Sequence, residues 1–123
     1  MLNFLFVALG GAAGACARYA ISLIEIKHVF PFQTFITNLF GAIAIGFLFG
    51  MVSVKKDVSP TLMLFLKVGV CGGFTTFSTF SLETLTLFEE GKFSIGIIYA
   101  VLSVLCCVLG VYAGQFAAVK TLS

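Results

Sequence analysis

Four long apolar stretches follow one another along the chain, and short polar segments separate them. They cover about residues 2–24, 32–54, 61–88 and 93–119. A helix that crosses a bilayer needs about 20 consecutive apolar residues, so each stretch is long enough for one crossing. The pattern predicts an all-α membrane protein with four transmembrane helices in a single domain, residues 1–123.

Small residues recur at four-residue spacing within these stretches. They are Gly10 and Gly14, then Ala42, Gly46 and Gly50, then Gly69 and Gly73, and finally Gly110 and Gly114. Such faces let helix backbones approach closely in lipid, where apolar helices gain little from simply meeting. Four closely packed helices enclose little interior, so we expect the chain to associate with itself.

Composition supports the membrane assignment. Hydrophobic residues make up 60% of the 123 positions and charged residues 10%, whereas soluble domains carry about 25% charged residues.

The four cysteines (Cys16, Cys71, Cys106 and Cys107) lie inside apolar stretches. That placement favours small packing residues over disulfides or metal ligands. The first stretch is too long for a signal peptide and has no basic segment before it, so we expect it to remain in the mature protein.

Lysine and arginine are almost evenly divided between the two sides of the membrane. One side holds Lys55, Lys56, Lys67 and Lys120, and the other holds Arg18, Lys27 and Lys92. Because Lys/Arg asymmetry orients membrane proteins, a chain without it is expected to insert both ways up. Two inverted copies could then pair as an antiparallel, dual-topology homodimer. The alternative is a weakly biased protein that another signal orients.

The third stretch contains an unusual polar segment. Its 28 residues would span about 42 Å as a continuous helix, and its middle holds Gly72, Gly73 and then five hydroxyl side chains up to Ser81. Adjacent glycines and hydroxyls weaken a helix, so we expect a break near residues 72–76. Carbonyls freed there would suit a small hard cation. The alternative is a kinked helix whose hydroxyls bond back to its own carbonyls.

Several polar and aromatic side chains inside the predicted spans leave two interpretations open. Asn38 shares a face with Gly41, Ala42 and Gly46, so it either joins two helices or offers its amide NH₂ to an anion. Phe77 and Phe80 are one turn apart. They either pack or present their electropositive ring edges to an anion.

Charged residues near the span ends also leave alternatives. Arg18 either reaches the membrane surface along its apolar stem or makes a vestibule positive. Glu83 is an intramembrane carboxylate, and such groups usually have a function. The alternative is that it is neutral and serves only as a hydrogen-bond partner of a neighbouring group. Tyr99 and Ser103 share one face of the fourth stretch, which we expect to point inward because a tyrosine hydroxyl in lipid needs a partner.

At these residues the chain resembles the Fluc (CrcB) family of small fluoride channels. The resemblance covers essentially the whole length. It rests on the glycine-rich first stretch ending at Arg18, on Thr37-Asn38-Leu39-Phe40-Gly41, and above all on residues 72–83, GGFTTFSTFSLE. It implies an antiparallel homodimer with two fluoride pores and a bound, non-transported sodium ion at its centre.

The resemblance also implies roles for particular residues. Sodium would be held by the backbone carbonyls of Gly72 and Thr75. The fluoride pore would be formed by Asn38, Thr76, Phe77, Ser78, Thr79, Phe80, Tyr99 and Ser103, with Arg18 and Glu83 in the vestibule. The family tends to continue hydroxyl residues along the fourth span, whereas this chain has Cys107 and Val111 there. The hydroxyl track along the fourth span is therefore expected to be shorter in this chain than in the family.

The implied function is passive export of cytoplasmic fluoride across the plasma (inner) membrane, which would lower fluoride toxicity. The partners expected are fluoride, a second copy of the chain and the lipid bilayer, with no nucleic acid. No phosphate-binding loop, His/Cys metal cluster or catalytic triad is visible, so we expect no enzyme activity. A proton-coupled cation exporter of similar size would need a carboxylate in the first stretch. A structural or holin-like protein would not need Asn38 and the hydroxyl-rich segment.

Overall fold

The computed structural model describes residues 1–123 and is entirely helical. Four of its helices are long and apolar enough to cross a membrane, as the hydrophobic pattern predicted, so the chain is a multi-pass membrane protein. The elements in order are α1 (Leu2–Ser22), α2 (Phe32–Val54), α3 (Pro60–Met63), the π-helix η1 (Leu64–Cys71), α4 (Gly72–Phe74), α5 (Phe77–Glu89) and α6 (Phe93–Leu122). The third span, Pro60–Glu89, therefore comprises α3, η1, α4 and α5.

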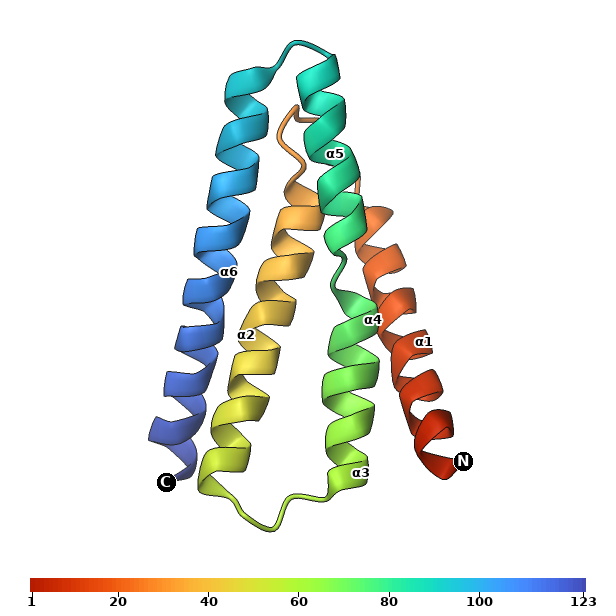
Figure 1. Ribbon diagram of the computed structural model, residues 1–123, viewed down its shortest axis with the longest axis vertical. Coiled ribbons are helices and arrows are strands. Elements are labelled where there is room, and N and C mark those ends of the chain that lie inside the picture. Colours follow the sequence, from red (N-terminus) through yellow and green to blue (C-terminus); the bar gives the residue numbers. More distant parts are fainter.

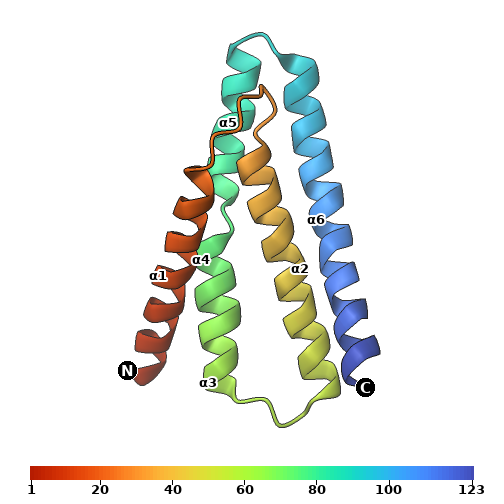
Figure 2. The same cartoon turned by 180° about the vertical axis from the view of Figure 1, so that it is seen from behind.

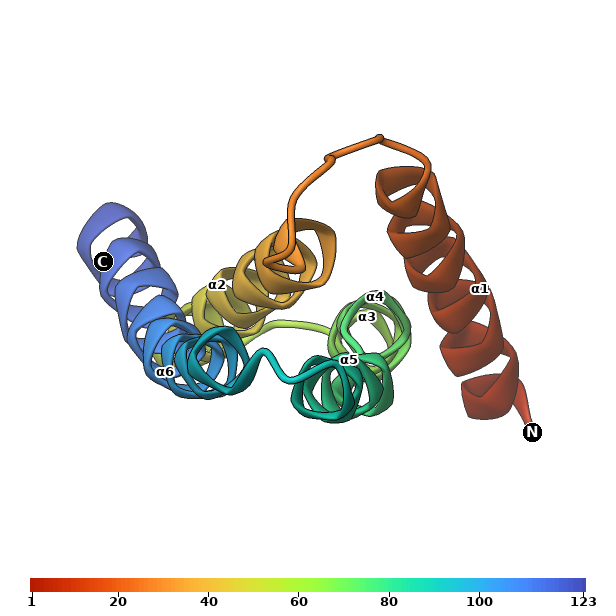
Figure 3. The ribbon, with the colours of Figure 1, turned by 90° about the horizontal axis from the view of Figure 1, so that it is seen from above.

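The helices run alternately up and down, with both termini and the α2–α3 loop at one end of the molecule (Figure 1). The other end carries the α1–α2 and α5–α6 loops, which the view from behind also shows (Figure 2). The most extensive packing joins α2 to α6 and α1 to η1 and α4, while α1 and α2 meet only slightly. Seen from above, α1 and α6 lie on opposite sides, with α2 and the third span between them (Figure 3).

Glycine faces hold both helix pairs together, as the four-residue spacing predicted. A Cβ built on Gly69 of η1 would lie 2.8 Å from the Cα atom of Gly10 in α1. In the other pair, a Cβ built on Gly114 of α6 would lie 2.8 Å from the backbone nitrogen of Phe47 in α2. Real Cβ atoms do not approach so closely, and so only glycine allows these helices their present spacing.

The third span is bent between α4 and α5. Thr75 and Thr76 have extended backbones with ψ angles of 156° and 112°, and they lie within residues 72–76, where we expected an interruption. The Thr76 hydroxyl caps α5 by accepting a hydrogen bond from the Thr79 amide at 3.2 Å. Before the bend, η1 has a π-helical hydrogen-bond pattern over eight residues. Such segments are rare and concentrate at functional sites, and nothing in the apolar pattern predicted this one.

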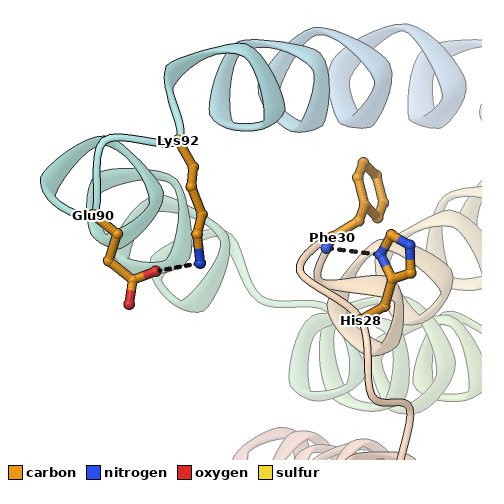
Figure 4. A network of polar contacts seen from close by, with 4 residues as sticks. All are labelled: His28, Phe30, Glu90 and Lys92. Atoms are coloured by element: carbon orange, nitrogen blue, oxygen red, sulfur yellow. Dashed lines mark hydrogen bonds and ion pairs between the residues drawn. The ribbon is translucent and has the colours of Figure 1, made fainter.

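The loops at the α5–α6 end are fixed by a few polar contacts (Figure 4). Lys92 forms an ion pair with Glu90 at 3.4 Å, and the backbone amide of Phe30 donates to Nδ1 of His28 at 3.0 Å. The Phe30 ring packs edge-on against Tyr99, with centroids 5.2 Å apart. The loop between α1 and α2 is thereby attached to α6.

Little of the chain is buried within one copy. Only 18 of 123 residues are buried, and large apolar side chains are exposed along every long helix. The principal buried cluster is small, formed by Phe80, Leu87 and Tyr99. Membrane-spanning helices can expose such surfaces because lipid or another membrane protein covers them.

Candidate functional site

The amide side chain of Asn38 holds the bend in the third span. Its Nδ2 donates to the Thr76 carbonyl at 3.1 Å, and its Oδ1 accepts from the Thr76 amide at 2.8 Å. Asn38 therefore joins α2 to the bend, which is one of the two roles its position predicted. An asparagine NH₂ carries two N–H groups, and the second makes no hydrogen bond within the chain, so it is free to donate to an ion.

Two backbone amides at the bend donate to side chains and not to the backbone carbonyls that a continuous helix would offer them. In a continuous α-helix the Thr76 amide would bond to the Gly72 carbonyl and the Thr79 amide to the Thr75 carbonyl. Here the Thr76 amide donates to Asn38 and the Thr79 amide to the Thr76 hydroxyl. The carbonyls of Gly72 and Thr75 thus lose the partners that an unbroken helix would give them.

Some hydroxyls bond back to the helix, as the alternative interpretation expected. The Thr75 hydroxyl donates to the Cys71 carbonyl at 2.9 Å, and the Ser81 hydroxyl donates to the Phe77 carbonyl at 2.9 Å. The Thr76 hydroxyl instead donates to the Thr79 hydroxyl at 3.0 Å. Back-bonded hydroxyls and a bent backbone therefore occur together in this span.

A cavity of about 350 Å³ lies between α2, the third span and α6. We call it the main cavity. Seven of the residues that the sequence marked as site residues line it: Asn38, Gly72, Thr75, Thr76, Phe77, Phe80 and Ser103. The other lining residues are Gly41, Ala42, Ile45, Lys67, Cys71, Val104, Cys107 and Val111.

A smaller cavity of about 70 Å³ lies nearer the α1–α2 loop and is lined by polar residues only. We call it the polar cavity, and its lining is Arg18, Ser22, Gln33, Thr34, Thr37, Thr76 and Thr79. Nε of Arg18 donates to the Gly73 carbonyl at 3.2 Å, so the guanidinium contacts the helix just before the bend. Thr76 lines both cavities, which places the bend between them.

The aromatic residues form a connected series beside the main cavity. The Phe77 and Phe80 ring centroids lie 5.5 Å apart, and Phe80 meets Tyr99 edge-to-face at 5.1 Å. Tyr99 is fully buried and its hydroxyl donates to Glu83 at 2.9 Å. Phe80 is 9% exposed and Phe77 76%, so Phe80 packs within one copy while Phe77 has most of its ring uncovered.

Three of the predicted site residues line neither of the two cavities. Tyr99 and Glu83 are bonded to each other behind Phe80. The Ser78 hydroxyl lies 3.4 Å from that of Thr76. By contrast, Ser103 lines the main cavity, and its Oγ is the one buried side-chain polar atom without a hydrogen-bond partner.

Sequence reasoning missed part of both linings. In the polar cavity these are Ser22, Gln33, Thr34 and Thr37, and the last two precede Asn38 and Gly41 by four residues on the same face of α2. Their three- and four-residue spacing was the signal that could have found them. In the main cavity it missed Lys67, because a cation seven residues into a span resembles one that reaches the interface.

Comparison with known proteins identifies the family of this polar, bent-helix bundle. The family model described as CrcB-like protein, Camphor Resistance (CrcB), matches residues 5–115. The chain belongs to the CrcB family. Its similarity to individual relatives extends over nearly the full length of both proteins.

Three relatives, each named fluoride-specific ion channel FluC, illustrate that similarity. The Desulfotalea psychrophila protein is 46% identical over 124 residues, covering 99% of this chain and 96% of the relative. The Ruminiclostridium cellulolyticum protein is 43% identical over 126 residues, covering 100% and 96%. The Shewanella halifaxensis protein is 42% identical over 118 residues, covering 94% of each. These relatives are ion channels, not enzymes.

Proposed function

We propose that this chain forms a fluoride-selective channel that passively exports cytoplasmic fluoride. The observation that carries the proposal is the hydrogen-bonded Asn38–Thr76 pair, in which Thr76 lines both the main and the polar cavity. That arrangement supplies hydrogen-bond donors at membrane depth, in a chain whose relatives are named fluoride-specific ion channels.

Fluoride binds water strongly, so a pathway must replace that water with donors. Asn38 offers its second amide N–H, Ser103 an unpartnered hydroxyl, and Thr79 a hydroxyl at the polar cavity. Phe77 and Phe80 add ring edges that carry partial positive charge. Ring edges hold an anion only weakly, and weak coordination lets the ion leave again. Arg18 would attract anions into the polar cavity, while Tyr99 and Glu83 would fix the aromatic series from behind.

Transport needs no energy source beyond the membrane potential. Hydrogen fluoride crosses membranes as a neutral acid and dissociates inside, which traps fluoride in the cytoplasm. A negative interior drives an anion outward by about 2.3 kcal/mol per charge per 100 mV. A fluoride pathway in the plasma (inner) membrane would therefore lower the cytoplasmic fluoride concentration and its toxicity.

We propose further that the working unit is an antiparallel homodimer. Four lysine or arginine residues on one side against three on the other give no strong orientation signal. Phe77 lines the main cavity yet is 76% exposed in one copy. A second copy placed against the third span would cover this ring and enclose the pathway.

Sodium fits the bend as a structural ion. Hard cations prefer oxygen ligands, and the Gly72 and Thr75 carbonyls are the ones whose helical donors are redirected. We propose that this span acts as a broken helix and that both copies contribute these carbonyls at the dimer centre. The ion would contribute positive charge there and remain bound while fluoride passes.

The deciding experiment is anion efflux from liposomes containing the purified chain, followed with fluoride- and chloride-selective electrodes. We expect fluoride efflux once a potassium ionophore lets potassium leave and so balances the charge carried by the anion. We expect no chloride efflux, because donors spaced for fluoride fit a larger anion poorly. Protein-free liposomes provide the control. Comparable chloride flux would contradict the selectivity, and absent fluoride flux would contradict the function.

A further inference from the structure

An exposed cation on the wall of the main cavity has no acidic partner within the chain. Lys67 lines this cavity, and no Asp or Glu does. The chain has a single salt bridge, between Lys92 and Glu90 in the α5–α6 loop. Lys67 also donates no side-chain hydrogen bond. A lysine in a membrane span normally has a partner or a function.

The position of Lys67 follows from the geometry of the third span. Lys67, Cys71 and Thr75 are four residues apart, and all three line the main cavity. Lys67 lies on the side of the bend facing the α2–α3 loop, and Arg18 approaches the bend from the α1–α2 loop end. Each end of the proposed pathway thus has one cation.

The rest of the cavity lining can donate hydrogen bonds to an anion but cannot neutralise a cation. Ser103 has an unpartnered hydroxyl there, and Asn38 has a spare N–H. Most of the remaining lining is apolar and gives a low-dielectric wall. Such walls concentrate the field of a charge within the cavity.

We propose that Lys67 is an anion-capture residue at the end of the pathway opposite Arg18, and that it attracts a small hard monovalent anion into the main cavity. This inference rests on the proposed fluoride channel. An ammonium group is a compact, strongly hydrated point charge on a flexible stem. It raises the local anion concentration without stripping the ion of water, so the anion can move on to Ser103 and Asn38.

The test compares Lys67→Gln, Lys67→Arg and Lys120→Gln in fluoride efflux from liposomes. Lys120 provides the matched control because its ammonium lies 5.7 Å from the Phe116 ring centroid and it lines neither cavity. Initial rates are measured from about 1 to about 100 mM fluoride, where the ionic strength corresponds to Debye lengths from about 100 to about 10 Å. In a parallel series, the fluoride concentration is held constant while the ionic strength is raised with the salt of a bulky, impermeant anion.

We expect Lys67→Gln to lose at least about threefold of the rate at the lowest fluoride concentration and to approach wild type at the highest. Added salt should slow wild type and Lys67→Arg more than Lys67→Gln, because salt screens a capture charge. Lys120→Gln should match wild type. Size-exclusion chromatography and the saturating rate verify that each variant is folded.

Equal rates and equal salt sensitivity for wild type and Lys67→Gln would overturn the inference. So would a loss in Lys67→Gln that is the same at every fluoride concentration, because that result indicates a structural role. If Lys67→Gln fails to fold, Lys67→Met takes its place, and the salt sensitivity of wild type against Lys67→Arg gives a second readout. If the wild-type protein shows no fluoride flux, the proposed function itself is wrong. If the wild-type protein conducts fluoride but substitution of Lys67 does not change the efflux rate, only this inference is wrong.

Discussion

Asn38 contributes both an acceptor and a donor to the bend, and the two can be separated by substitution. Asn38→Leu removes both hydrogen bonds to Thr76, so the Thr76 amide loses its acceptor. We expect fluoride efflux to fall at least about tenfold. Asn38→Asp keeps the acceptor and loses the donor, and it places a negative charge on an anion path.

Fluoride efflux and amide hydrogen exchange at Thr76 distinguish these two effects. We expect Asp to preserve the slow exchange of the Thr76 amide while abolishing efflux, and Leu to lose both. Phe49→Leu, at an exposed position on the same helix that lines neither cavity, is the control for a general disturbance of α2. Normal efflux in Asn38→Leu would contradict the proposed role.

The two phenylalanines of the pathway differ in how much a substitution should disturb folding. Phe80 packs on Tyr99 at 5.1 Å, so Phe80→Ile removes an aromatic contact worth about 0.5–1.5 kcal/mol. Phe77 is 76% exposed, so Phe77→Ile should leave the fold of one copy intact. If the ring edges bind fluoride, both variants should lose at least about tenfold of the efflux rate.

The Phe77 variant is therefore the sharper test of the ring-edge interaction. Phe74→Ile, in the same span but outside this pair, is the comparison and should retain efflux. Size-exclusion chromatography of each variant separates a lost site from a lost dimer. The ring-edge hypothesis is wrong if intact dimers of both Phe77→Ile and Phe80→Ile conduct fluoride normally.

Among the helices, the contact between α1 and η1 depends on Gly10 and not on its neighbour Gly11. A Cβ at Gly10 would lie 2.9 Å from the Gly69 Cα and 3.0 Å from the Val70 nitrogen, whereas a Cβ at Gly11 has nothing within 4 Å. Gly10→Ala should cost about 1–3 kcal/mol, the usual penalty for overpacking. Gly11→Ala should be nearly neutral.

The measurement is the midpoint temperature of thermal denaturation in detergent, followed by the loss of the size-exclusion peak. The Gly11 variant controls for the general effect of alanine on helix propensity, since both positions lie within α1. Equal midpoints for the two variants would show that α1 does not need this close approach.

The elements that the sequence predicted well are those governed by local chemistry. Span positions follow from the length of apolar runs, and the extended residues Thr75 and Thr76 lie within the predicted interval because glycines and hydroxyls weaken a helix locally. The π-helix η1 was not predictable, since its register depends on packing against α1. For the same reason the place of Lys67 in the main cavity required the fold.

For the whole molecule, the charge balance predicts insertion in both orientations. The check is thiol labelling in intact cells of a variant in which the native cysteines are replaced and Ser123→Cys supplies one reactive site. A membrane-impermeant reagent should label a fraction of the chains, and permeabilisation should expose the rest. Full labelling or full protection before permeabilisation would contradict the antiparallel dimer.

Sodium removal tests the centre of that dimer. In the proposed dimer, loss of the cation would leave the Gly72 and Thr75 carbonyls of the two copies with uncompensated repulsion between their dipoles. We expect exhaustive exchange of sodium for a large organic cation to abolish fluoride efflux, and restored sodium to recover it. Purified dimers that conduct normally after exhaustive sodium removal would show that the carbonyls need no ion.

The hydroxyl chain at the bend has a direction. Because the Thr76 hydroxyl accepts from the Thr79 amide and donates to the Thr79 hydroxyl, its proton is committed, and the free proton of the pair belongs to Thr79. Successive hydrogen bonds polarise one another, so Thr79 is a stronger donor than an isolated threonine, and it lines the polar cavity. The donor end of the hydroxyl pair therefore lies on the Arg18 side of the bend.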